Sequence, residues 1–98
     1  LSFYAVLKEV HSLRRFQVLV YPENRLELRI EEKDGVSKDA AFKDAKACLV
    51  KFLATQNIVQ VTIMLSEEVP KQNPNSGKFK HIINVQNNLN FVNWINNN

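Results

Sequence analysis

The stretch RRFQVLVYPENRLELRI, residues 14–30, decides the fold because two strand patterns flank one short turn. From residue 26 to residue 30, apolar and charged residues alternate strictly, as in a strand with one buried and one solvated face. Residues 14–21 place Phe16, Val18 and Val20 on one face and Gln17 among the residues of the other. The intervening Pro-Glu-Asn, residues 22–24, favours a turn. The stretch therefore predicts a β-hairpin.

A long amphipathic helix is predicted next along the chain. Ser37 is placed as its N-cap and Asp39 in its first turn, where a negative charge favours the helix dipole. A helix of roughly 17 residues fits the periodicity. Cys48 lies beside the apolar face, and we interpret it as a small buried hydrophobe rather than a catalytic thiol. The apolar residues that recur at three- and four-residue steps are Phe42, Ala45, Leu49, Phe52 and Leu53.

Three further segments complete the expected element order. Residues 58–65, IVQVTIML, predict a central strand that is apolar on most of both faces. After a polar excursion, residues 79–85 predict a last strand that begins directly after Lys78. Residues 2–10 fit a strand or, almost equally well, a helix. The expected class is α+β, with a small, mainly antiparallel sheet and a long helix packed on one of its faces.

The chain length of 98 residues fits one small domain, which we expect to span residues 1–86. A composition shift follows, since asparagine dominates from residue 84 onward while several large apolar residues remain. For this Asn-rich C-terminal tail, residues 87–98, a short helix, a frayed segment and a position outside the natural fold all stay open.

Composition excludes several classes of function. With 45% apolar and 23% charged residues, the chain has the make-up of a globular protein, and no apolar run reaches the length needed to cross a bilayer. A net charge of +3, spread over the chain, does not favour a nucleic-acid partner. Cys48 is the only cysteine, and His11 and His81 are the only histidines. We therefore expect no disulfide, no metal site and a reducing, cytoplasmic location.

The first residue is not methionine, which suggests that the chain is a fragment. The chain begins at Leu1, its only methionine is Met64, and no signal peptide is visible. We expect a fragment or a trimmed chain.

The stretch PKQNPNSGKFKHIINV, residues 70–85, contains the residues best suited to chemistry. Gly77 can adopt backbone angles that are closed to other residues, and Lys78 supplies a cation on a long stem. That pairing suits an anionic, phosphate-like partner, although Ser76, Gly77 and Lys78 also have the composition of an ordinary solvated turn. His81 has no identifiable partner for a general-base role, so we expect it to be structural or exposed.

Over residues 14–85 the sequence resembles the C-terminal domain of adenylate-forming (AMP-binding) enzymes, the superfamily of acyl-coenzyme A synthetases, and in particular the phenylacetate-coenzyme A ligase branch. Three features carry the resemblance: Phe16-Gln17 opening a strand, the strand at residues 26–30, and Pro70-Lys71 leading to Ser76-Gly77-Lys78. The resemblance implies a ferredoxin-like lid domain that works with an N-terminal adenylation domain of the same chain.

The resemblance also implies the roles of individual residues. Lys78 matches the family's adenylation lysine, and Ser76 and Gly77 would shape its loop. Lys71 stands where the family often has arginine, and Gln72-Asn73-Pro74-Asn75 lengthens the loop. ATP, coenzyme A and magnesium would be bound with the adenylation domain, so this chain alone is expected to be inactive.

Two other functions compete with the ligase interpretation. A ferredoxin-like regulatory module that binds a small ligand or a protein would leave Lys78 dispensable. An RNA-binding sheet would need exposed aromatic residues on neighbouring strands. Phe16 and Phe79 are instead expected in the core, and neither a nucleic-acid nor a membrane partner is expected.

Overall fold

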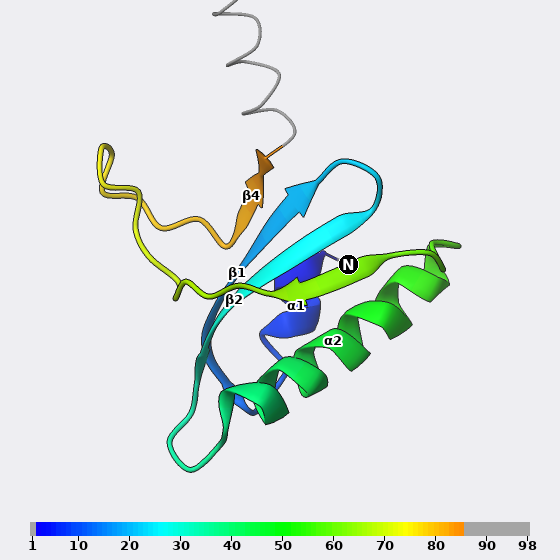
Figure 1. Ribbon diagram of the computed structural model, residues 1–98, viewed down its shortest axis with the longest axis horizontal. Helices are drawn as coiled ribbons and strands as arrows, with labels where there is room; N and C mark the ends of the chain where they lie inside the picture. The colour runs from blue at the N-terminus through cyan, green and yellow to red at the C-terminus, as the bar shows by residue number, and fades with distance from the viewer. Residues whose placement is uncertain (1, 86–98) are drawn as a thin grey trace, which may run out of the picture.

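The hairpin predicted from residues 14–30 forms the centre of the sheet. In the computed structural model, which describes residues 2–85, strands β1 (Leu13–Tyr21) and β2 (Arg25–Glu32) pair antiparallel, with Phe16 opposite Ile30 (Figure 1). Glu23 and Asn24 in the connecting turn both have positive φ, 64° and 56°. The predicted hairpin is confirmed.

Two short strands flank the hairpin and make the sheet mixed. Strand β3 (Thr62–Leu65) runs parallel to β2, strand β4 (Ile82–Asn84) runs parallel to β1, and the order is β3-β2-β1-β4. The α+β class with a long helix on one face is confirmed, but the expected mainly antiparallel pairing is wrong. A helix follows β2 and carries the chain back along the sheet, so β3 starts at the same end as β2.

Strand β3 is an edge strand, not the predicted central one. Only Thr62–Leu65 pairs with the sheet, although the apolar run begins at Ile58. Ile63 alone in this strand is buried, whereas Val59 and Met64 are 79% and 60% exposed. The β-branched composition indicated a strand but not how many neighbours it has, because a continuous apolar run fits either position.

Helix α2 (Lys38–Thr55) confirms the predicted amphipathic helix. The Ser37 hydroxyl accepts a hydrogen bond from the Ala40 amide at 3.1 Å, so Ser37 is the N-cap. Cys48 is exposed, and its prediction as a buried residue is wrong. It lies about 100° around the helix from Leu49, which is far enough to leave the buried face. The buried residues of α2 are Ala41, Ala45, Leu49 and Leu53.

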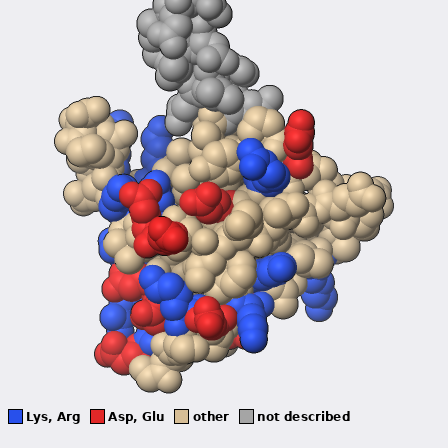
Figure 2. All heavy atoms as spheres, viewed as in Figure 1, with Lys and Arg blue, Asp and Glu red and all other residues tan. Residues whose placement is uncertain are grey.

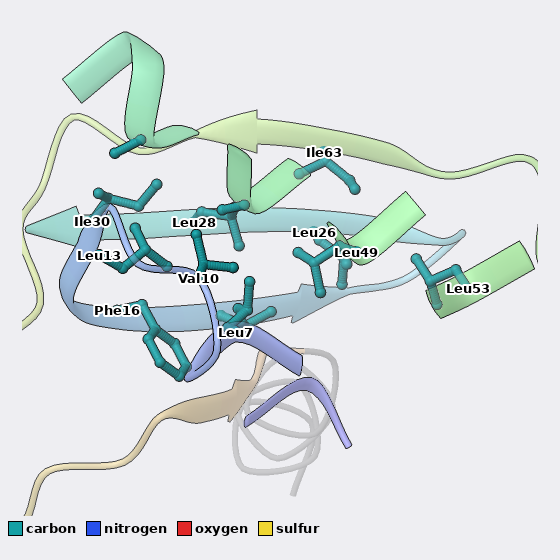
Figure 3. Close-up of a cluster of buried hydrophobic side chains, with 13 residues drawn as sticks. Leu7, Val10, Leu13, Phe16, Leu26, Leu28, Ile30, Leu49, Leu53 and Ile63 are labelled. Carbon is teal, nitrogen blue, oxygen red and sulfur yellow. The ribbon is translucent and has the colours of Figure 1, made fainter. Parts of the chain in front are cut away.

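The hydrophobic core fills the space between α2 and one face of the sheet (Figure 3). Leu49 and Leu53 approach from α2, and Leu26, Leu28 and Ile63 approach from the sheet. We call this side of the sheet the core face.

A short N-terminal helix and an aromatic ring contribute to the same core. Helix α1 (Phe3–Leu7), whose cap is Ser2, settles the ambiguity of residues 2–10 in favour of a helix and contributes buried Leu7. Phe16 is buried as predicted, while Phe79 is only half-buried.

Surface properties of the described residues agree with the scattered charge of the sequence. Figure 2 shows basic and acidic side chains interspersed on one face of the molecule instead of gathered in a single patch. None of the helices in residues 2–85 has the length and apolar character needed to span a membrane. The predicted tail, residues 87–98, lies outside the described residues.

Candidate functional site

Gln17 organises the face of the sheet that points away from α2, which we call the loop face. Its neighbours Phe16 and Val18 point into the core, so alternation along β1 directs Gln17 to the opposite side. The residue is 1% exposed, and its Nε2 donates hydrogen bonds to the carbonyl oxygens of Lys71 and Lys80, both at 2.9 Å. Its Oε1 accepts from the Lys71 amide at 3.1 Å. One buried amide therefore fixes both ends of the loop formed by residues 70–80.

These hydrogen bonds explain why β4 starts later than predicted. The Lys80 carbonyl accepts from the Gln17 side chain instead of from a backbone amide of β1, and the first hydrogen bond between β1 and the last strand runs from the Val18 amide to the His81 carbonyl at 2.7 Å. Regular pairing begins only at Ile82. The expectation of a strand directly after Lys78 is wrong, and Lys78 belongs to the loop.

Residues 73–78 form a closed turn inside this loop. The Asn73 amide donates to the Lys78 carbonyl and the Gly77 amide donates to the Asn73 carbonyl, each at 2.8 Å. The Asn73 side chain accepts from the amides of Asn75 and Ser76, and the Ser76 hydroxyl accepts from the Lys78 amide at 3.3 Å. Gly77 has φ +71°, a left-handed conformation that favours glycine. The closed turn fixes the Lys78 backbone while its side chain stays exposed.

An ion-pair network lies beside Gln17. Arg29 of β2 donates from Nη1 to Gln17 Oε1 at 3.3 Å and from Nη2 to Glu68 Oε2 at 2.9 Å. The Lys71 ammonium donates to the other Glu68 oxygen at 2.7 Å. The Lys71 hydrogen bond, together with the charges of Lys71 and Arg29, lowers the pKa of Glu68 below its ordinary value. The Arg29 side chain is 13% exposed, and its Nε is buried without an acceptor among the described residues.

A cavity of about 480 Å³ opens between this loop and the sheet. Its lining has no carboxylate among the described residues. Four basic residues line it: Arg29, Lys71, Lys78 and Lys80. Lys78 and Lys80 form no ion pair within residues 2–85. The arrangement is suited to binding an anion.

Of the four predicted site residues, two line the cavity and two do not. Lys71 and Lys78 line one cavity, whereas Ser76 and Gly77 lie in the closed turn and do not line it. Sequence reasoning missed Gln17, Arg29 and Lys80 as parts of this site. The usable signal was Gln17, an amide between Phe16 and the apolar residues 18–20, because a buried polar group requires partners.

His81 packs within an aromatic cluster on the other side of the loop. The rings of Tyr4, Phe16 and Phe79 lie 4.7, 5.1 and 5.0 Å from the His81 ring, measured between centroids. This packing gives the half-buried His81 a structural role.

No potential metal centre is found in the part of the chain that the structure describes, since no three His, Cys, Asp or Glu residues gather there. Comparisons of the chain with family models, with curated proteins and with solved structures each found no match.

Proposed function

We propose that this chain is the C-terminal lid domain of an ATP-dependent aryl- or acyl-coenzyme A ligase and that Lys78 is its adenylation lysine. The observation that carries the proposal is the presentation of Lys78. Its backbone is fixed by the closed turn, and its exposed ammonium has no ion-pair partner among the described residues. Another protein surface that docks on the loop would therefore contact the Lys78 ammonium, whose backbone is held in place by the turn.

The chemistry proposed for Lys78 is electrostatic. When a carboxylate attacks the α-phosphorus of ATP and pyrophosphate leaves, negative charge develops on the oxygens around that phosphorus. An ammonium positioned at those oxygens in a water-poor site lowers the energy of the transition state. Lys71, which pairs with Glu68, and Lys80 would add positive potential near the same loop.

The proposed roles of the two domains follow from the resemblance to adenylate-forming enzymes. ATP, coenzyme A and magnesium would be bound by an N-terminal adenylation domain, the proposed partner of this chain. The lid would approach to insert Lys78 for adenylation and turn away for thioester formation, a motion typical of domains that complete a site only when needed. The proposed reaction would take place in the cytoplasm, and the 98-residue chain alone would be inactive.

The test is ATP-pyrophosphate exchange on the full-length protein with a panel of aryl and short acyl acids. Lys78→Ala should lower exchange about a hundredfold to a thousandfold, because one stabilising contact to the developing charge is lost. Thioester formation from preformed acyl-adenylate should survive.

The matched control is Lys46→Ala, which removes an exposed lysine from α2, on the other side of the sheet. Equal exchange rates in the Lys78→Ala and Lys46→Ala proteins would refute the role of Lys78. If no acid supported exchange even in the unmodified protein, the ligase proposal would be abandoned.

A ferredoxin-like regulatory module is the second candidate, and the observation that favours it is the cavity lined by four basic residues. This candidate predicts ligand binding by the isolated chain, with Lys78 as one of four basic residues around the ligand and no specific role for it in adenylation.

A further inference from the structure

We infer that the cavity between the loop face and residues 70–80 binds a phosphoryl-type oxyanion, which displaces the Glu68 carboxylate from Arg29 and Lys71. The inference does not depend on the ligase proposal. It concerns equilibrium binding to this chain, and it names Glu68, which pairs with two of the lining residues, as the carboxylate that competes with the ligand.

Charge is the first argument. Four basic side chains line the cavity, and Glu68 is the only acidic residue that pairs with any of them within residues 2–85. One carboxylate cannot neutralise the four cations that line the cavity, so the cavity retains a positive potential. A doubly charged oxyanion would compensate it more completely than Glu68 does.

The hydrogen bonding of Arg29 is the second argument. Its guanidinium is held in place by Gln17 and Glu68, yet its Nε is enclosed and has no acceptor among the described residues. A buried donor without an acceptor is costly. A tetrahedral oxyanion in place of the carboxylate offers more oxygens, so the Nε and Nη2 edge of Arg29 can be bound in the bidentate manner that guanidinium and phosphate favour.

The position of Glu68 makes the exchange possible. Its side chain is 54% exposed, so it can turn into solvent without burying a charge. Both partners of the Lys71–Glu68 pair are about half exposed, and ion pairs at such exposure contribute little to stability. Release of Glu68 therefore costs little compared with the contacts that an oxyanion gains.

The Gln17 side chain, which fixes the loop, also positions two of the basic residues, Lys71 and Lys80. Gln17 bonds the carbonyls of Lys71 and Lys80, and this sets the spacing between the two lysine stems. The volume of about 480 Å³ admits a phosphorylated small molecule and is within the usual range for ligand sites. On the face that Figure 2 shows, basic and acidic side chains are interspersed, which does not favour a nucleic-acid groove there.

The direct test is a titration of the ¹⁵N-labelled 98-residue chain with inorganic phosphate and, in a second arm, with a phosphomonoester, both at constant ionic strength set with chloride. We expect saturable shifts at the amides of Lys71 and Lys80 and at Arg29 Nε–H. Tighter binding of the phosphomonoester would identify an organic phosphate as the ligand, whereas equal binding would assign the site to the phosphoryl group alone.

Four variants separate this site from general charge attraction. Glu68→Gln should tighten phosphate binding several-fold, because it removes the competing carboxylate while keeping the shape of the side chain. Arg29→Lys should weaken it by about tenfold or more, since the bidentate contact is lost. Lys80→Gln, at an exposed position that the fold does not need, should weaken binding, and Lys46→Gln on α2 should leave it unchanged.

Three results would overturn the inference. Linear, non-saturable shifts would show that no site exists. Equal affinities in Lys80→Gln and Lys46→Gln would show attraction to net charge only. Unchanged or weaker binding in Glu68→Gln would exclude displacement of Glu68. None of these measurements uses ATP or an acid substrate, so failure here is distinguishable from failure of the ligase proposal.

Discussion

On the core face of the sheet, a cluster of 13 buried apolar residues joins the strands to α1 and α2. On the loop face, by contrast, a single buried amide, Gln17, joins β1 to Lys71 and Lys80, which lie 54 and 63 positions further along the chain. On the core face, many weak contacts between apolar side chains together stabilise the fold, and these residues are expected to unfold as one cooperative unit. On the loop face, directional hydrogen bonds concentrate the organisation in one side chain. The two faces should therefore respond differently to mutation.

The largest effect is expected on the core face. Leu49→Ala removes a fully buried side chain from α2 and should lower the free energy of unfolding by about 2–5 kcal/mol. The measurement is urea denaturation followed by circular dichroism. Val50→Ala on the same helix, where the side chain is 44% exposed, is the control and should cost much less. Similar losses in the two proteins would contradict the described packing of α2.

A smaller and more local effect is expected on the loop face. Gln17→Leu keeps the bulk of the side chain but leaves the Lys71 amide and the carbonyls of Lys71 and Lys80 without this partner, at a cost of about 1–3 kcal/mol. Hydrogen exchange should accelerate at the Lys71 amide far more than at the amides of α2. Gln60→Leu, at an exposed position, is the control. A uniform acceleration across the chain would show that the two faces unfold together.

The smallest effect concerns acid stability of the loop face. Arg15 donates a hydrogen bond to Glu31 at 2.6 Å, and this bond, supported by the charges of Arg15 and Arg14, lowers the pKa of Glu31. The folded pKa is below the unfolded one, so the stabilisation is present at neutral pH and is lost as pH falls from about 5 through the folded pKa. Glu31→Gln should flatten this part of the pH-stability curve.

The control for this measurement is Glu9→Gln, because Glu9 forms no ion pair among residues 2–85. Thermal melts between pH 3 and pH 7, about the range in which carboxylates titrate, provide the comparison. A slope that is unchanged by Glu31→Gln would exclude Glu31 as its source.

The core face could be predicted from the sequence, and the reason is periodicity. Alternation in residues 14–30 and three- and four-residue spacing along α2 both arise from burying one side of a regular element. The Ser37 cap followed from a local rule that depends on adjacent residues only. Pairing direction and strand position did not follow, since an apolar run such as residues 58–65 fits several places in a sheet.

The loop face could be predicted only in part. The composition of Ser76-Gly77-Lys78 indicated a turn with an available lysine, and the turn forms with Gly77 at positive φ. The partners of Gln17 could not be predicted, because hydrogen bonds across more than 50 residues leave no periodic trace in the sequence. Because the cavity and the position of Arg29 depend on those hydrogen bonds, neither was predicted from the sequence.

The closed turn at residues 73–78 has a practical consequence for engineering. The Asn73 and Lys78 backbones meet at its base, so residues added between Pro74 and Asn75 would lengthen a loop whose ends are already joined. The entropic cost of such an insertion grows slowly, by about 0.6 kcal/mol for each doubling of loop length. A peptide epitope or a fluorescent tag grafted at this point would project from the domain without crossing the sheet, and would report on what the loop docks against.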